Sequence, residues 1–185
     1  MGEQHKKHNR REHLNDFHLN VAGEYVYDGA LYACQSDDAK QRRSKRAVWG
    51  MAAILTVAVA AGGCIPAPGM QNCFYVLLPY LGEFLGAASV IWALAKLGMD
   101  WGTVREYNYK KSVAVLPVRT AVTAVFSLLG IVCELIFFFV NDHAGQTFFA
   151  LLYVLLKLTA LLSALVLRAE IMQAEWDKLP KKDNS

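Results

Sequence analysis

Four long apolar runs, separated by short polar segments, dominate the chain after residue 46. They cover about residues 47–65, 74–97, 120–140 and 147–167. A helix rises about 1.5 Å per residue, so about 20 apolar residues cross a hydrocarbon core about 30 Å thick. Each run has about that length and predicts a membrane-spanning helix. The pattern therefore predicts an all-α protein, an integral membrane four-helix bundle over residues 47–168.

The polar segments on either side of these runs predict smaller elements. Residues 1–46 contain too few apolar residues to build a core. Within them, residues 24–33 hold two short β-prone runs, EYVY and ALYA, around Asp28-Gly29, a pair that favours a two-residue turn. We expect a short β-hairpin-like element here, which either packs locally or docks a partner protein. Residues 169–185 predict a helical extension that Pro180 stops, followed by a tail.

The distribution of basic residues predicts the orientation of the spans. The net charge of +3 is small, and 55% of the residues are apolar. The loops after the first and third runs contain no Lys or Arg, and all but one of the 19 basic residues lie in the N-terminal segment, the middle loop with its flanks, or the C-terminal end. Cytoplasmic loops carry the excess of basic residues in membrane proteins. We expect a multi-pass protein of the cell membrane with both termini in the cytoplasm.

A basic cluster precedes the first run directly. Such a cluster anchors the cytoplasmic end of a first span, and it can also bind anionic lipid headgroups or nucleic acid. We favour the anchoring role and expect the lipid bilayer, and no nucleic acid, as its partner. The cluster at residues 40–46 consists of Lys40, Arg42, Arg43, Lys45 and Arg46.

Three ionisable residues lie inside the apolar runs. Lys157 is at the middle of the fourth run, about 15 Å from its outer end at the helical rise. Glu83 is about 14 Å deep in the second run, and Glu134 is about 9 Å deep in the third. A charge at the bilayer centre is costly and is normally paired inside the bundle. The depths therefore predict a Glu83–Lys157–Glu134 cluster that joins three spans.

This intramembrane cluster has two interpretations. It can neutralise its own charges and fix which helices pair, or it can line a path for a proton, an ion or a small solute. Four spans make a narrow bundle, and no ionisable chain continues from the cluster to the cytoplasmic side. We therefore favour the structural role and keep transport as the alternative.

Two further pairs of residues stand out around the first outer loop and the second span. Cys64 and Cys73 bracket the loop and either form a disulfide on the oxidising side or remain free thiols. Gly82 and Gly86 form a GxxxG face, which favours close packing of helices over contact with a ligand.

No enzyme signature accompanies these features. The chain has no HExxH, GxSxG or P-loop motif. The spacings of His5, His8, His13 and His18 do not place them on one helical face, and no cysteine lies among them. We expect no catalytic residue, no metal and no cofactor. The sequence favours a non-catalytic accessory, scaffold or regulatory protein that contacts another membrane protein or a second copy, with a small transporter or channel component as the alternative.

Overall fold

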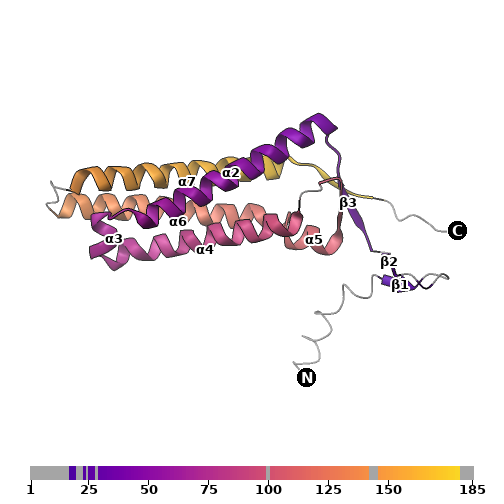
Figure 1. Cartoon of the computed structure of the whole chain (residues 1–185), viewed down its shortest axis with the longest axis horizontal. Coiled ribbons are helices and arrows are strands. Elements are labelled where there is room, and N and C mark those ends of the chain that lie inside the picture. Colours follow the sequence, from indigo (N-terminus) through magenta and orange to yellow (C-terminus); the bar gives the residue numbers. More distant parts are fainter. Residues whose placement is uncertain are drawn as a thin grey trace, which may run out of the picture.

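The computed structural model describes residues 17–19, 23, 25–27, 29–98, 101–141 and 146–179. The polar tail expected at the N-terminus up to residue 16, and the tail expected from Pro180 onward, lie outside the described residues. Four long helices run side by side along the length of the molecule (Figure 1). They are α2 (Asp38–Cys64), α4 (Phe74–Leu97), α6 (Leu116–Val140) and α7 (Thr147–Gln173).

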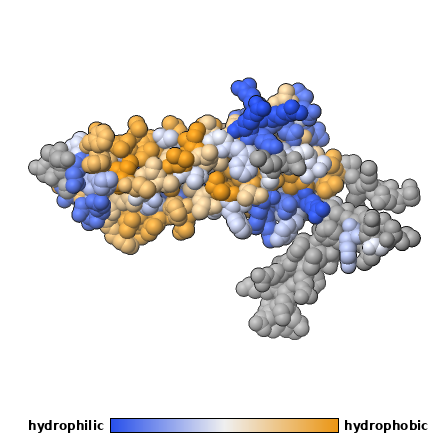
Figure 2. Space-filling view, in the orientation of Figure 1, coloured by the Kyte–Doolittle hydropathy of each residue, from blue (hydrophilic) through white to orange (hydrophobic). Residues whose placement is uncertain are grey.

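All four helices are long and apolar enough to cross a membrane. This confirms that the four predicted runs form long apolar helices. Large apolar side chains also cover the outside of the bundle, and Figure 2 shows that hydrophilic residues gather toward its ends. Phe139 and Phe148, for example, are 81% and 70% exposed. Such an exterior suits hydrocarbon rather than water, because soluble proteins rarely expose large contiguous apolar surfaces.

Three of the helices extend beyond the predicted apolar runs. Helix α2 begins at Asp38, so the basic cluster at residues 40–46 lies on its first turns. Lys and Arg are good helix formers, and nothing in KQRRSKR interrupts the helix. Helix α6 begins at Leu116 and has Pro117 in its first turn, where the missing amide hydrogen is not needed. Helix α7 continues past residue 167 to Gln173.

In the described residues, two short helices occupy loops between the long helices. Helix α3 (Pro68–Asn72) lies between α2 and α4, and its Pro68 and Gly69 are buried. It contacts α4, α6 and α7, so the loop between α2 and α4 folds back over the end of the bundle. Helix α5 (Glu106–Lys111) precedes α6 on the opposite end (Figure 1).

The strands correct the predicted hairpin. Strand β2 (Tyr25–Tyr27) pairs with β1 (Phe17–Leu19), and strand β3 (Leu31–Cys34) does not pair with β2. Strand β3 is instead the central strand of a three-stranded antiparallel sheet between β4 (Thr103–Arg105) and β5 (Trp176–Lys178). The predicted hairpin over residues 24–33 is therefore wrong. An isolated two-stranded hairpin is marginally stable, whereas β3 gains ladders on both edges.

Aromatic rings hold this sheet against the bundle. Tyr32 of β3 stacks on Tyr109 of α5, with ring centroids 4.2 Å apart and an interplanar angle of 2°. Trp176 of β5 lies 6.0 Å from Tyr109 and 6.1 Å from Trp101. These contacts fix β5 beside the bundle.

The end of the C-terminal helix is a second correction. The sequence predicts a helix that continues as far as Pro180, but α7 ends at Gln173, because residues 176–178 pair with β3.

Two apolar clusters of described residues pack in the interior of the bundle. The larger includes Val48, Val90, Leu94 and Leu167 and extends to Trp101 beneath the sheet. The smaller is rich in alanine and includes Ala58, Ala87, Ala160 and Ala164. Helices α4, α6, α7 and α2 follow one another in extensive contact, whereas α2 and α4 touch much less. The small residues let the helices approach closely without a driving force from water.

Candidate functional site

A buried ion pair lies at the centre of the bundle. The ammonium group of Lys157, on α7, pairs with the Oε2 atom of Glu83, on α4. Glu83 is 0% exposed and Lys157 is 1% exposed. An isolated ammonium at the bilayer centre costs on the order of 2.5–3.5 kcal/mol on insertion scales. The sequence places these two charges at nearly the same depth, and in the structure they are in direct contact.

Helix α6 contributes a third member to this pair. The hydroxyl of Ser127 donates to Oε1 of Glu83 at 2.5 Å, and it also lies 3.1 Å from the carbonyl oxygen of Thr123. Each oxygen of the Glu83 carboxylate therefore accepts a hydrogen bond. Because α4, α6 and α7 each supply one side chain, the network holds three spans in a defined register.

Two tyrosine rings surround the ammonium of Lys157. Its nitrogen lies 4.5 Å from the ring centroid of Tyr80 and 5.0 Å from that of Tyr153. The negative face of an aromatic ring attracts a cation, and the attraction grows when water is absent. Gly130 on α6 lies beside the lysine side chain, and a Cβ at that position would be in ordinary van der Waals contact with Lys157 Cε, at 3.6 Å.

Glu134, the third residue of the predicted cluster, has a partner in the loop between α2 and α4. It is 0% exposed, and its Oε1 accepts a hydrogen bond from the backbone N–H of Gly69 at 3.3 Å. This bond ties α6 to the short helix α3. A Cβ on Gly69 would meet the same carboxylate, so the loop approaches Glu134 through a residue with no side chain. The structure thus brings Glu83 and Lys157 together and connects Glu134 to the loop backbone.

The GxxxG face of α4 packs against α6. A Cβ at Gly82 would lie 2.6 Å from the ring of Phe126, and one at Gly86 would lie 2.5 Å from Thr123 Oγ1 and 3.3 Å from Thr123 Cα. Both glycines therefore stand where a residue of α6 leaves no room for a side chain on α4. This is the geometry that small residues provide between membrane helices.

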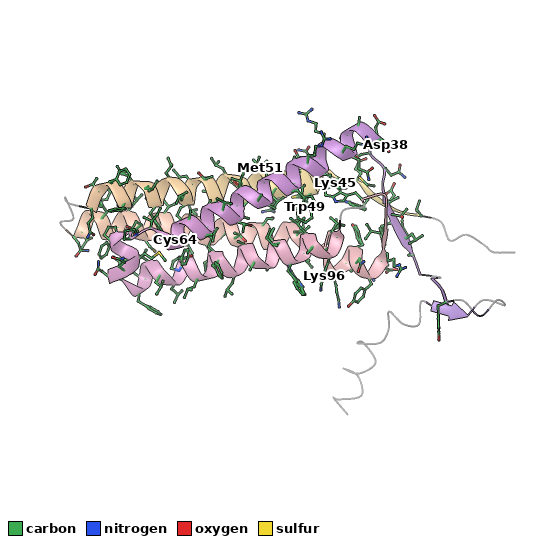
Figure 3. All side chains as sticks on the ribbon, viewed as in Figure 1. Asp38, Lys45, Trp49, Met51, Cys64 and Lys96 are labelled. Atoms are coloured by element: carbon green, nitrogen blue, oxygen red, sulfur yellow. The ribbon has the colours of Figure 1, made fainter. Side chains whose placement is uncertain are left out.

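The remaining predicted residues lie at the two ends of the bundle. The structure does not join Cys64 to Cys73. Both are free thiols, and the segment between them folds into α3. Figure 3 shows Cys64 at the opposite end of α2 from Asp38 and Lys45. Of the basic cluster, Lys45 is half-buried, while the others are exposed, namely Lys40, Arg42, Arg43 and Arg46.

Sequence reasoning missed Ser127, Tyr80, Tyr153 and Gly69. A signal for the two tyrosines was available, because Tyr153 precedes Lys157 by four residues and Tyr80 precedes Glu83 by three. Residues at these spacings share a helix face. No comparable signal pointed to Ser127 or Gly69, because the role of each depends on a contact with a residue far away in the sequence.

No metal centre accompanies the ion pair within the described ranges. They contain no group of three or more His, Cys, Asp or Glu residues placed to hold a metal ion. Comparison of the chain with models of protein families, with curated proteins and with solved structures finds no match. The site is therefore interpreted from its own geometry. What the network can do chemically is neutralise two charges inside an apolar bundle and fix the order of its helices.

Proposed function

We propose that this chain is a multi-pass protein of the cell membrane with a non-catalytic accessory, scaffold or regulatory role. The observation that carries the proposal is the Glu83–Lys157 pair with Ser127. Its charges neutralise each other, and its members come from three helices. A network built in this way stabilises a bundle and sets its register. It offers no free nucleophile or acid–base pair to a substrate.

The surface of the bundle supports a role in contacting other proteins. A cleft of about 340 Å³ lies between α2 and α4, the two neighbouring helices that touch least. Small residues allow the backbones of membrane helices to approach. We propose that a transmembrane helix of a partner protein packs there, and a second copy of this chain is the other candidate. The small residues that line the cleft are Thr56, Ala60, Ala87, Ala88 and Ala95.

We propose further that both termini are cytoplasmic, which a labelling experiment can test. Cys34 and Cys64 lie at opposite ends of the bundle and are half-buried and exposed, respectively. Two variants are made, in which either Cys34 or Cys64 is the single cysteine of the chain. A membrane-impermeant maleimide is expected to label Cys64 in intact cells. Cys34 is expected to react only after the cells are permeabilised. The reverse pattern would place the termini outside.

Transport is the alternative function, and the buried tyrosine favours it most. The hydroxyl of Tyr153 is fully buried and has no hydrogen-bond partner among the described residues. A buried polar group of this kind can be completed by water, which a proton path requires. However, neither the cleft of about 340 Å³ between α2 and α4 nor a cleft of about 250 Å³ beside the first turns of α2 is lined by Glu83, Glu134 or Lys157.

A flux measurement separates the two functions. Purified protein is reconstituted into liposomes that contain a pH-sensitive dye, and a proton gradient is imposed. If the network is structural, the wild-type protein is expected to leak protons no faster than protein-free liposomes. The matched control is E83Q/K157M, which removes both charges. A wild-type flux that this double variant abolishes would contradict the accessory role and establish the transport function.

A further inference from the structure

A second cleft lies at the end of the bundle where the basic cluster begins. It has a volume of about 250 Å³ and lies between the first turns of α2, the last turn of α7 and strand β3. We call it the α2–α7 cleft. It is smaller than the roughly 300–1,000 Å³ of pockets for drug-sized ligands, so it suits a small chemical group. Its lining consists of Cys34, Ser36, Lys40, Gln41, Arg43, Ser44, Trp101, Glu170, Gln173 and Ala174.

The lining of this cleft is rich in hydrogen-bond donors. Lys40 and Arg43 supply two cationic groups from successive turns of α2. Ser36 and Gln41 add a hydroxyl and an amide from the same strand–helix junction, and Gln173 adds an amide from α7. Guanidinium and ammonium groups next to neutral donors are the usual partners of phosphate oxygens.

The one acidic group in the lining does not cancel this positive charge. Glu170 accepts a hydrogen bond from the hydroxyl of Ser44 at 3.0 Å, which ties α7 to α2 at the wall of the cleft. With Lys40 and Arg43 at +1 each and Glu170 at −1, the lining has a formal charge of +1. The hydrogen bond to Ser44 holds the Glu170 carboxylate at the wall of the cleft, and Lys40 and Arg43 remain to attract an anion.

The position of the cleft indicates where such an anion comes from. Lys40 and Arg43 are exposed and lie directly before the apolar part of α2, which starts near Ala47. Figure 2 shows hydrophilic residues gathered at this end, next to the apolar surface of the bundle. The cleft therefore lies at the depth of lipid headgroups. Anionic lipids of the cytoplasmic leaflet concentrate phosphate groups at that depth.

We propose that the α2–α7 cleft binds a phosphate-type anion, supplied by the headgroup of an anionic phospholipid. Lys40 and Arg43 bind the phosphate oxygens, and the neutral donors around them select for a group that accepts several hydrogen bonds. The site is separate from the Glu83–Lys157 pair; it rests on the proposed cytoplasmic position of this end of the bundle and not on the accessory function. Free phosphate has the same chemistry, and the experiment distinguishes the two sources.

Cys34 provides the readout, because it lines the cleft. The full chain, with Cys64, Cys73 and Cys133 replaced by alanine, is placed in nanodiscs of phosphatidylcholine with increasing phosphatidylglycerol. The rate of maleimide labelling at Cys34 is measured at each composition. We expect phosphatidylglycerol to slow the labelling. In K40Q/R43Q, the amount of phosphatidylglycerol needed for half-maximal protection is expected to rise about tenfold or more, because the phosphate then loses both of its cationic partners in the cleft and each such hydrogen bond contributes about tenfold to binding.

The matched control removes the same charge from the same helix outside the cleft. Arg42 and Arg46 are exposed members of the basic cluster and do not belong to the lining of the cleft. R42Q/R46Q is expected to shift the protection midpoint much less than K40Q/R43Q, and K40R/R43K is expected to keep it near wild type. All variants change exposed side chains, and size-exclusion chromatography verifies that each is folded. Equal shifts in the two glutamine pairs would overturn the proposal, because the attraction would then belong to the whole basic surface.

A phosphate titration identifies the source of the anion. Inorganic phosphate is added to nanodiscs of pure phosphatidylcholine, with chloride at matched ionic strength as the control. Protection of Cys34 by phosphatidylglycerol alone supports a lipid headgroup. Protection by inorganic phosphate as well supports a site that takes the free anion. If neither protects Cys34 in the chain that retains Lys40 and Arg43, the cleft is not an anion site.

Discussion

Replacing Lys157 by methionine is expected to reduce the amount of folded protein sharply. The change leaves the Glu83 carboxylate without its ion-pair partner in the apolar interior. Breaking a buried ion pair by removing one partner typically costs roughly 3–5 kcal/mol. Glu83→Gln is expected to act in the same direction, because it leaves the ammonium of Lys157 among the rings of Tyr80 and Tyr153 without a counter-charge. The measurement is the monodisperse fraction after extraction in mild detergent, together with its thermal midpoint.

The double variant E83Q/K157M separates a charge effect from a packing effect. Both charges are absent, and Ser127 keeps an acceptor in the Thr123 carbonyl oxygen. The double variant is therefore expected to recover most of the loss, since replacing a whole buried ion pair is often neutral. If the double variant is as poor as the sum of the single ones, the pair does not stabilise the bundle through its charges. Wild-type stability of K157M alone would contradict the structural role entirely.

Replacing Gly86 by leucine is expected to separate α4 from α6. Even the first carbon of a side chain would lie 3.3 Å from the backbone Cα of Thr123. A backbone atom cannot turn away as a side chain can, so the helix itself must shift. Overpacking of this kind typically costs about 1–3 kcal/mol, and a leucine adds more atoms to the clash. We expect a lower thermal midpoint and a lower folded yield than for Gly82→Ala, where the ring of Phe126 can move.

Gly50→Ala is the control for this experiment. A Cβ at Gly50 meets nothing within 4 Å, and the residue is exposed on α2. Alanine is the better helix former by about 1 kcal/mol in soluble hosts, so stability should hold or rise slightly. If Gly86→Leu behaves like Gly50→Ala, the α4–α6 contact is looser than the structure describes.

The spans could be predicted from sequence because one physical requirement determines them. A helix in hydrocarbon needs about 20 apolar residues, and the run at residues 74–97 coincides with α4. The helix ends were harder to predict, because they depend on groups outside the membrane. The basic residues before Ala47 form the first turns of α2, and α7 ends shortly before residues 176–178, which pair with β3. The hydropathy of the sequence indicates neither the early start of α2 nor the early end of α7.

The candidate site was predictable in part for a similar reason. Depth along a span can be counted, and counting brought Glu83 and Lys157 to the same level. The partner of Glu134 could not be predicted by counting depth along a span. Gly69 belongs to the loop helix α3, whose position depends on how it packs over the bundle. The two thiols at Cys64 and Cys73 illustrate the same difficulty. Their spacing permits a disulfide, but the helix between them decides how the ends of α2 and α4 are connected.

The predicted hairpin failed because local turn chemistry competed with distant pairing. Asp28-Gly29 is a good turn pair, and the two runs around it are prone to form strands. The pairing partners of β3, however, are separated from it by two and by four spans along the chain. Single-sequence patterns describe neighbours in the chain, and this sheet is built from segments that become neighbours only after the helices have packed.

The three-stranded sheet also has a consequence for biosynthesis. Strand β3 emerges from the ribosome before any span, whereas β5 follows the last one. The edge of β3 that pairs with β5 must therefore stay open while the four long helices between the two strands are synthesised. Pairing over such a separation in the chain is slow, and an open strand edge is a point where chains associate wrongly. Closure of the sheet by residues 176–178 is thus possible only after all four long helices between β3 and β5 have been synthesised.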